Sequence, residues 1–140
     1  MGRNAWAKAL GNAAAGGSTF GVKGHKYGAK RTTTPDGEVF DSKGESDRWA
    51  VLKQAEWAGI IVKGSLERQP RFPLVVNGVK VCEYRADFKY TYRDEKGINR
   101  IVVEDYKGMV TPVARLKLNL FEAVFGYPVK IVTKAKEGIG

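Results

Sequence analysis

Two acidic residues and a lysine stand at the end of an apolar stretch, Ile101-Val102-Val103-Glu104-Asp105-Tyr106-Lys107-Gly108. In a β-strand alternate side chains share a face, so we expect Asp105 and Lys107 on one side and Glu104 on the other. Asp87 lies on the strand expected before this one, and antiparallel pairing can bring it beside Asp105. Because neighbouring carboxylates repel each other unless a cation neutralises them, these residues indicate a site for Mg²⁺ or Mn²⁺, which prefer oxygen ligands.

Glu45 supplies a third carboxylate, because it begins the stripe by which a predicted helix meets the sheet. The end of the strand also leaves the main-chain carbonyl of Tyr106 available as a metal ligand. One or two metal ions bound there can lower the pKa of a water and stabilise charge on a phosphate during in-line displacement. Lys107 would then hold the water, deprotonate it or offset the phosphate charge, and the sequence leaves these roles open.

Each of these signals has a structural alternative. Ser42-Lys43-Gly44-Glu45 matches the capping box S-x-x-E, in which the acid only closes the N-terminus of a helix. Asp87, Asp105 and Lys107 can instead form a solvated charge ladder on a polar sheet face. The combination is more specific than any of its parts, because one acid starts a helix, another lies on a strand, and an acid-x-lysine pair ends the next strand.

The elements that must position these residues follow from hydrophobic period and turn signals. A helix is predicted from the capping box to Ala58-Gly59, with Trp49, Leu52 and Glu56 along one stripe. Asn77-Gly78 predicts a type I′ hairpin turn, and Asp94-Glu95-Lys96-Gly97 predicts the next turn. Between these turns the alternation predicts one continuous strand. Its expected core face is Cys82, Tyr84, Ala86, Phe88, Tyr90 and Tyr92, and its expected polar face is Glu83, Arg85, Asp87, Lys89 and Thr91.

A second helix is predicted to start at Thr111-Pro112 and to end at Gly126-Tyr127-Pro128. The expected apolar stripe of this helix is Val113, Leu116, Leu120 and Val124. Short strands are expected at residues 38–40 and 129–132. The order helix, antiparallel hairpins, helix and strand predicts an α/β fold of the α+β type, with a central mixed sheet flanked by helices.

Length and composition limit the class of protein. The chain has 140 residues, and 24 Lys and Arg against 15 Asp and Glu give a formal net charge of +9. This length predicts one domain, over residues 25–135, followed by a tail at 136–140. The lone Cys82 excludes an intramolecular disulfide and a Cys-based zinc site, and no apolar run reaches the length of a membrane span. We therefore expect a cytoplasmic protein that uses no membrane and no small-molecule cofactor.

The basic residues are concentrated at the start of the chain, where residues 1–35 carry six Lys and Arg and no acid. Residues 1–24 show no sustained period and are expected to form a flexible basic arm. Such an arm favours a polyanionic partner, above all nucleic acid, although a solvated tail is the alternative. The candidate phosphate-binding residues are Lys23, Lys26, Lys30 and Arg31, together with Arg115 and Lys117 on the second predicted helix.

The arrangement resembles the PD-(D/E)XK nuclease superfamily, and within it the small phage and prophage endonucleases that resolve DNA junctions (endonuclease I-like). It is also similar to the restriction-like, end-cleaving subunit of heteromeric transposases. The motifs that carry the resemblance are Lys26-Tyr27-Gly28-Ala29-Lys30, Phe40-Asp41-Ser42-Lys43-Gly44-Glu45, Leu66-Glu67-Arg68-Gln69-Pro70-Arg71-Phe72, Tyr84-Arg85-Ala86-Asp87-Phe88, Val103-Glu104-Asp105-Tyr106-Lys107-Gly108 and Thr111-Pro112 with Arg115-Leu116-Lys117.

The resemblance implies a restriction-endonuclease-like core and metal-dependent hydrolysis of phosphodiester bonds. It assigns Glu45 as the helix acid, Asp87 as the central metal ligand, and Asp105 with Lys107 as the D-x-K pair. Gln69 matches a supporting active-site residue of the family. The sequence departs from the family name at one point, because Ala86 precedes Asp87 where the name has proline.

The leading functional hypothesis is a magnesium-dependent DNA endonuclease that acts on branched DNA, like a Holliday-junction resolvase, in phage recombination or replication. It would be a homodimer, because cutting two strands requires two active sites at a fixed separation, and it would work in the host-cell cytoplasm. One alternative is a non-catalytic basic DNA-binding protein on the same fold. Another is a site-specific nuclease or transposition subunit that needs a partner, and the same residues would also serve RNA as a substrate.

Overall fold

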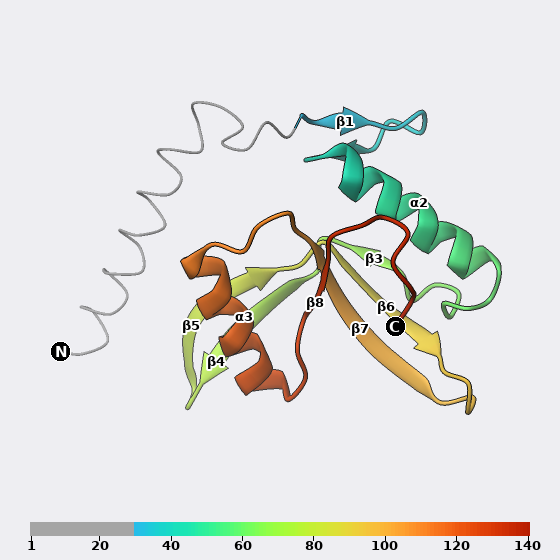
Figure 1. Ribbon diagram of the computed structural model, residues 1–140. Coiled ribbons are helices and arrows are strands. Elements are labelled where there is room, and N and C mark those ends of the chain that lie inside the picture. The colour runs from blue at the N-terminus through green and yellow to red at the C-terminus, as the bar shows by residue number, and fades with distance from the viewer. Residues whose placement is uncertain (1–29) are drawn as a thin grey trace. The chain divides into compact units, whose positions relative to one another are not determined.

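The computed structural model of the chain describes residues 30–140, so the expected basic arm, with Lys23 and Lys26, lies outside the described residues (Figure 1). The described chain divides into two compact units between Lys43 and Gly44. The expectation of one domain over residues 25–135 remains a prediction. The first unit is an antiparallel pair of short strands, β1 (Thr32–Thr33) and β2 (Val39–Phe40), and the strand expected at residues 38–40 is confirmed.

The second unit combines two helices with strands in a mixed arrangement, which confirms the α+β fold class (Figure 1). Its helices are α2 (Lys43–Trp57), which starts at the boundary between the units, and α3 (Pro112–Phe125). Its strands are β3 (Glu67–Arg68), β4 (Arg71–Val76), β5 (Val79–Arg85), β6 (Phe88–Arg93), β7 (Asn99–Tyr106) and β8 (Lys130–Val132). Within residues 30–140, no helix combines the length and hydrophobicity that crossing a membrane requires.

Four of these strands form one long hairpin with a bend. The register that pairs Arg71 with Arg85 in β4 and β5 continues in β3 and β6, where Arg68 is opposite Phe88. At the predicted tip between β4 and β5, Asn77 and Gly78 both have positive φ, 50° and 76°, which confirms the type I′ turn.

The expectation of one continuous strand between the two turns is wrong, because the strand breaks at Ala86-Asp87 into β5 and β6, which belong to different sheets. On the opposite strand Gln69 has a φ of 50°, and Pro70 has no N–H to complete the ladder. Two hydrogen bonds still cross the bend, from Gln69 N to Asp87 O (2.8 Å) and from Ala86 N to Pro70 O (3.1 Å). The bend therefore preserves the register while it turns the strands.

The central sheet has the order β3-β6-β7-β8, and β8 runs parallel to β7 while the other pairs are antiparallel. The two halves of the bent hairpin pack against different helices. In β5, Tyr84 contacts Phe121 of α3 with ring centroids 5.7 Å apart. In β6, Phe88 stacks on Trp49 of α2 at 5.6 Å. The strand predicted at 129–132 is thus present as β8, and the predicted turn at residues 94–97 is closed by a hydrogen bond of 2.9 Å from Gly97 N to Asp94 O.

Helix α3 begins as predicted, since the Thr111 side chain caps it and Pro112 is its first residue. The predicted apolar stripe is wrong for Val113 and Leu116, whereas Leu120 does pack against the core. Leu118 and Phe121 are buried, whereas Val113 and Leu116 are 54% and 55% exposed. Apolar residues occupy most of the circumference of this helix, and the larger aromatic side chains decide which face turns inward. Phe121 packs in a ring cluster with Phe72, Phe125 and Tyr127.

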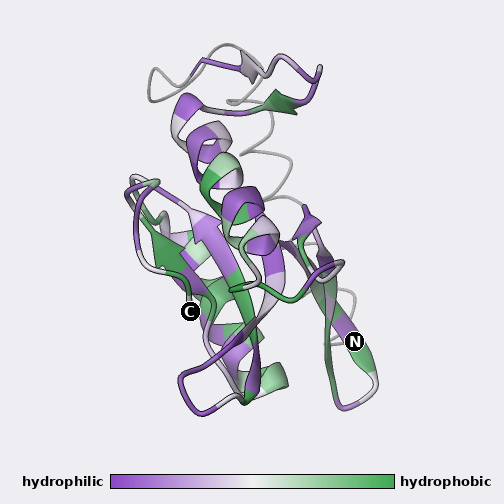
Figure 2. Cartoon of the chain, turned by 90° about the vertical axis from the view of Figure 1, so that its right-hand side faces the viewer, coloured by the Kyte–Doolittle hydropathy of each residue, from purple (hydrophilic) through white to green (hydrophobic). Residues whose placement is uncertain are grey.

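Helix α2 is mostly hydrophilic (Figure 2), and its fully buried residues include an arginine. Arg48 donates from Nε to Glu104 Oε1 (2.6 Å) and from Nη2 to Glu104 Oε2 (2.9 Å), and both side chains have no exposed surface. Tyr90 donates its hydroxyl to the same carboxylate at 2.9 Å. The remaining Arg48 donors reach the carbonyls of Ala135, Glu137 and Gly138. This ion pair therefore joins α2, β7 and the segment after β8, including part of the tail expected at 136–140.

Replacing Arg48 with Met should lower the free energy of unfolding by about 3–5 kcal/mol, because it leaves the Glu104 carboxylate buried without its counter-charge. The measurement is urea unfolding followed by circular dichroism. The control is Arg100→Met, which breaks an exposed ion pair of Arg100 with Asp94 at 2.7 Å and should change the free energy of unfolding far less. Equal losses in the two variants would contradict this account of the core.

Candidate active site

Asp87 and Asp105 come together beside the bend of the hairpin. Asp105 Oδ1 accepts a hydrogen bond from the Asp87 backbone N–H at 3.1 Å, and Asp87 Oδ2 accepts one from the Tyr106 N–H at 2.7 Å. These two bonds interlock the carboxyl groups of neighbouring chain segments. The expectation that strand pairing brings the two acids together is therefore confirmed.

The adjacent acids of β7 face opposite ways, as the strand period predicts. Lys107 Nζ lies 3.3 Å from Asp105 Oδ2, while Glu104 points to the other face, toward Arg48. The Lys107 backbone N–H donates to Val132 O of β8 at 3.0 Å, which fixes the chain after β7. Asp105 is 2% exposed and the Lys107 side chain is 28% exposed. The ammonium group therefore lies between a buried carboxylate and solvent.

Glu45 is in the first turn of α2 and is 5% exposed. The residue before it, Gly44, explains how this turn approaches β7. A Cβ atom at Gly44 would overlap the ring and hydroxyl of Tyr106, so a larger residue there would require the Tyr106 side chain to move. The close approach brings the Glu45 charge near enough to Asp87 to act on its pKa.

The carboxylate charges of Asp105 and Glu45 disfavour a third negative charge on Asp87. Burial, and then the charges of Asp105 and Glu45, raise the pKa of Asp87 to about 8. A divalent cation would relieve this repulsion, and carboxylate oxygens are the donors that Mg²⁺ and Mn²⁺ prefer. Within residues 30–140, no three His, Cys, Asp or Glu side chains already form a ligand cage. The donor types fit such an ion, and binding it would require these carboxyls to exchange protein hydrogen-bond donors for the metal.

Tyr84 is part of the site, although the sequence placed it only on the core face of its strand. Its buried hydroxyl donates to Asp105 Oδ2, the oxygen that also contacts Lys107. Burial, followed by the charge of Asp105, raises the pKa of the Tyr84 hydroxyl. The one signal in the sequence for this role is that a predicted core position carries tyrosine rather than phenylalanine. A buried tyrosine hydroxyl usually has a hydrogen-bond partner.

Gln69 lies between β3 and β4 and is exposed. Its backbone adjoins the site through the hydrogen bond to Asp87 O, and its positive φ is uncommon for a residue other than glycine. The role of its side chain, like the use of the Tyr106 carbonyl as a metal ligand, remains a prediction.

The predicted phosphate-binding residues are spread over different parts of the chain. Lys30 and Arg31 are exposed in the first unit, where Arg31 Nε lies 3.8 Å from Asp41 Oδ1. On α3, Arg115 is exposed, whereas Lys117 donates from Nζ to the Glu83 carbonyl at 3.3 Å. Lys117 therefore joins α3 to β5 in this structure, and phosphate binding by these residues remains a prediction.

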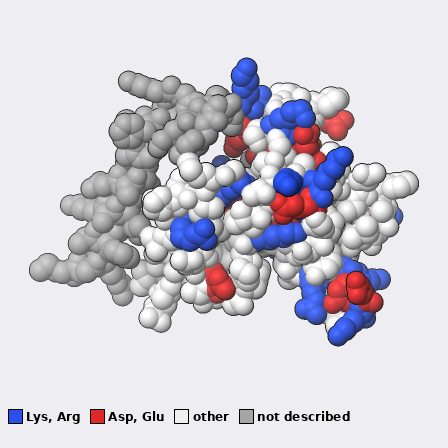
Figure 3. Space-filling view, viewed as in Figure 1, with Lys and Arg blue, Asp and Glu red and all other residues white. Residues whose placement is uncertain are grey.

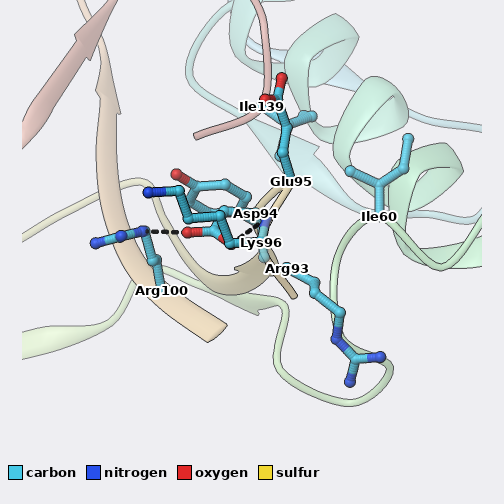
Figure 4. A pocket seen from close by; sticks show the side chains of 8 residues that line it. Ile60, Arg93, Asp94, Glu95, Lys96, Arg100 and Ile139 are labelled. Atoms are coloured by element: carbon cyan, nitrogen blue, oxygen red, sulfur yellow. Dashed lines mark hydrogen bonds and ion pairs between the residues drawn. The ribbon is translucent and has the colours of Figure 1, made fainter. Parts of the chain in front are cut away.

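The turn between β6 and β7 carries a separate, mixed group of charges, visible at the lower right of Figure 3. A hollow of about 480 Å³ lies beside this turn. Arg100 and Asp94 form an ion pair in its wall (Figure 4). Ile60, Tyr92, Arg93, Glu95, Lys96 and Ile139 complete the lining. None of the carboxylates of the candidate site belongs to this lining.

The family described as "Protein of unknown function (DUF1064)" matches residues 24–136. The chain belongs to this family. The DUF1064 match includes Glu45, Asp87, Asp105 and Lys107, so the whole candidate site lies within the family region. No curated protein and no solved structure matches the chain.

The raised pKa of Asp87 predicts how the stability of this DUF1064 chain depends on pH without divalent cations. The folded chain holds the Asp87 proton up to about pH 8, whereas the ordinary pKa is 3.8. Because the folded state then binds more protons than the unfolded state, stability should fall as pH rises through this window. Asp87→Asn should remove most of this fall and raise the Tm at pH 8 by roughly 5–10 °C.

The measurement is thermal unfolding in EDTA at several pH values between 4 and 8.5. Asp36→Asn, which changes an exposed carboxylate in the turn between β1 and β2, should keep the pH dependence of the wild type. If Asp87→Asn and wild type lose stability equally with rising pH, the Asp87 carboxyl is not the titrating group.

Proposed function

We propose that this chain is a metal-dependent nuclease that hydrolyses phosphodiester bonds in DNA. The observation that carries the proposal is the cluster in which two interlocked acids, Asp87 and Asp105, meet Lys107 at the end of β7. The nearby Glu45 adds a third carboxylate, which is buried like that of Asp105. A carboxyl group such as Asp87, whose pKa is raised by burial and by two neighbouring carboxylates, is typical of functional sites rather than of surface charge ladders.

Each group of the site has a role in this proposal. Asp87, Asp105 and Glu45, with the Tyr106 carbonyl, would hold Mg²⁺ or Mn²⁺. The bound ion would supply Lewis acidity and an activated water. Lys107 would hold a proton or a water at Nζ or offset charge on the phosphate, and Tyr84 would orient Asp105 through its hydrogen bond. Gln69 would support the site from the bend.

We further propose branched DNA as the substrate, with action as a cytoplasmic homodimer in phage recombination or replication. The net charge of +9 supports a polyanionic substrate. The recessed position of the carboxylates, two of them buried and Asp87 half-buried, supports a reaction at a single phosphate rather than broad electrostatic binding. The sequence resemblance to junction-resolving endonucleases supports the choice of branched DNA.

The decisive test is cleavage of a labelled four-way junction and a linear duplex of matched sequence, each with Mg²⁺ and with EDTA. Wild type should cut the junction only with Mg²⁺. Asp87→Asn and Lys107→Ala should each reduce the rate by at least about 100-fold, because they remove a proposed metal ligand and a charge at the reacting phosphate. DNA binding by Asp87→Asn should persist or become stronger.

Lys96→Ala is the matched control, since it removes an exposed lysine from the turn between β6 and β7 and should cleave like wild type. Full activity of Asp87→Asn would contradict the site assignment. Binding of both DNAs without cleavage of either would favour a non-catalytic DNA-binding protein, or a nuclease subunit that needs a partner. Cleavage of an RNA substrate alone would replace DNA in the proposal.

A further inference from the structure

Two arginines face each other on the outer arm of the bent hairpin. Arg71 of β4 and Arg85 of β5 are directly paired in the antiparallel register. Directly opposed residues share a face of the hairpin, with Cβ atoms about 4.5–5.5 Å apart, and like charges at this distance destabilise the pair. An anion bound between the two guanidinium groups would remove this repulsion.

The protein neutralises this pair only in part. Arg71 Nη1 lies 3.2 Å from Glu83 Oε1, but Lys80 Nζ shares the same carboxylate at 3.5 Å. Arg85 is exposed, and within residues 30–140 its guanidinium makes no hydrogen bond or ion pair. Residues 71–85 thus carry three cations, Arg71, Lys80 and Arg85, and one acid, Glu83. The Arg71 contact is solvent-exposed, so it contributes little and can open at small cost.

The arginine pair lies next to the candidate active site. Arg85 is two residues before Asp87 in the chain, and Arg71 is two residues after Gln69, whose N–H donates to Asp87 O across the bend at 2.8 Å. Cα atoms two residues apart are separated by at most about 7 Å, whether or not the strand is regular. Neighbouring phosphates on one nucleic acid strand are separated by a similar distance. A strand whose phosphate reaches Asp87 therefore has its next phosphate within reach of the arginines.

We propose that Arg71 and Arg85 together bind a non-scissile phosphodiester group of the substrate, next to the phosphate at the carboxylate site. The inference rests on the proposed function and names the side chains that position its substrate. Guanidinium groups bind phosphate oxygens in a bidentate manner. One phosphate between the two arginines would also remove their mutual repulsion. The bend of the hairpin would then set the register of the DNA strand against Asp87.

The test measures binding of a labelled four-way junction in EDTA, without cleavage, over a range of salt concentrations. Arg85→Gln and Arg71→Gln should each weaken binding by roughly five- to tenfold. Each should also reduce the slope of log affinity against log salt by about 1, as expected for one lost phosphate contact. Lys80→Gln removes one positive charge from the same hairpin, which also carries Arg71 and Arg85, and should change affinity by less than about twofold.

The outcomes separate the inference from the function on which it rests. If wild type binds the junction and the two arginine variants behave like Lys80→Gln, the arginine pair is only a charged strand surface and the inference is wrong. If wild type binds neither junction nor duplex, the proposed function itself fails. Circular dichroism and thermal unfolding of each variant check that the fold is kept, and Arg85→Lys, which keeps the charge without the planar fork, should recover only part of the affinity.

Discussion

The buried ion pair between Arg48 and Glu104 is the constraint on which the rest of the second unit depends. A buried carboxylate needs a counter-charge, and Arg48 supplies it with two hydrogen bonds from α2. This fixes both the position of α2 on β7 and the direction in which β7 presents its side chains. With Glu104 committed to the arginine, the next residue, Asp105, must point to the other face. Two adjacent acids thus acquire opposite roles, one structural and one at the candidate site.

The bend of the long hairpin completes the arrangement. At the bend the chain leaves the regular ladder, so Asp87 can use its carboxylate to accept the Tyr106 N–H and its own N–H to reach Asp105. In a regular strand the Asp87 N–H would instead donate to a backbone carbonyl of the neighbouring strand. The positive φ of Gln69 and the missing N–H of Pro70 are therefore part of how the two acids meet. The strained backbone of Gln69 thus lies at the candidate site, next to the irregular segment that lets Asp87 and Asp105 interact.

Local rules account for what could be predicted from the sequence. The Asn77-Gly78 turn, the start of α3 and the opposite directions of Glu104 and Asp105 each depend on a few neighbouring residues. The features that could not be predicted depend on contacts between distant segments. Arg48 and Glu104 are 56 positions apart, and nothing in the stripe of α2 marks an arginine as buried. The same reason explains the error in the inward face of α3. That face is set by the packing of Phe121 on Phe72 and Tyr84, which belong to other elements.

The acceptors of Arg48 have a consequence for how the molecule is made. Three of its hydrogen bonds go to carbonyls 87, 89 and 90 positions further along the chain. During synthesis α2 leaves the ribosome early, but its buried arginine can be fully satisfied only after residues 135–138 have emerged. A nascent or truncated copy that lacks residues 135–138 would therefore leave part of the buried Arg48 guanidinium without its hydrogen-bond acceptors.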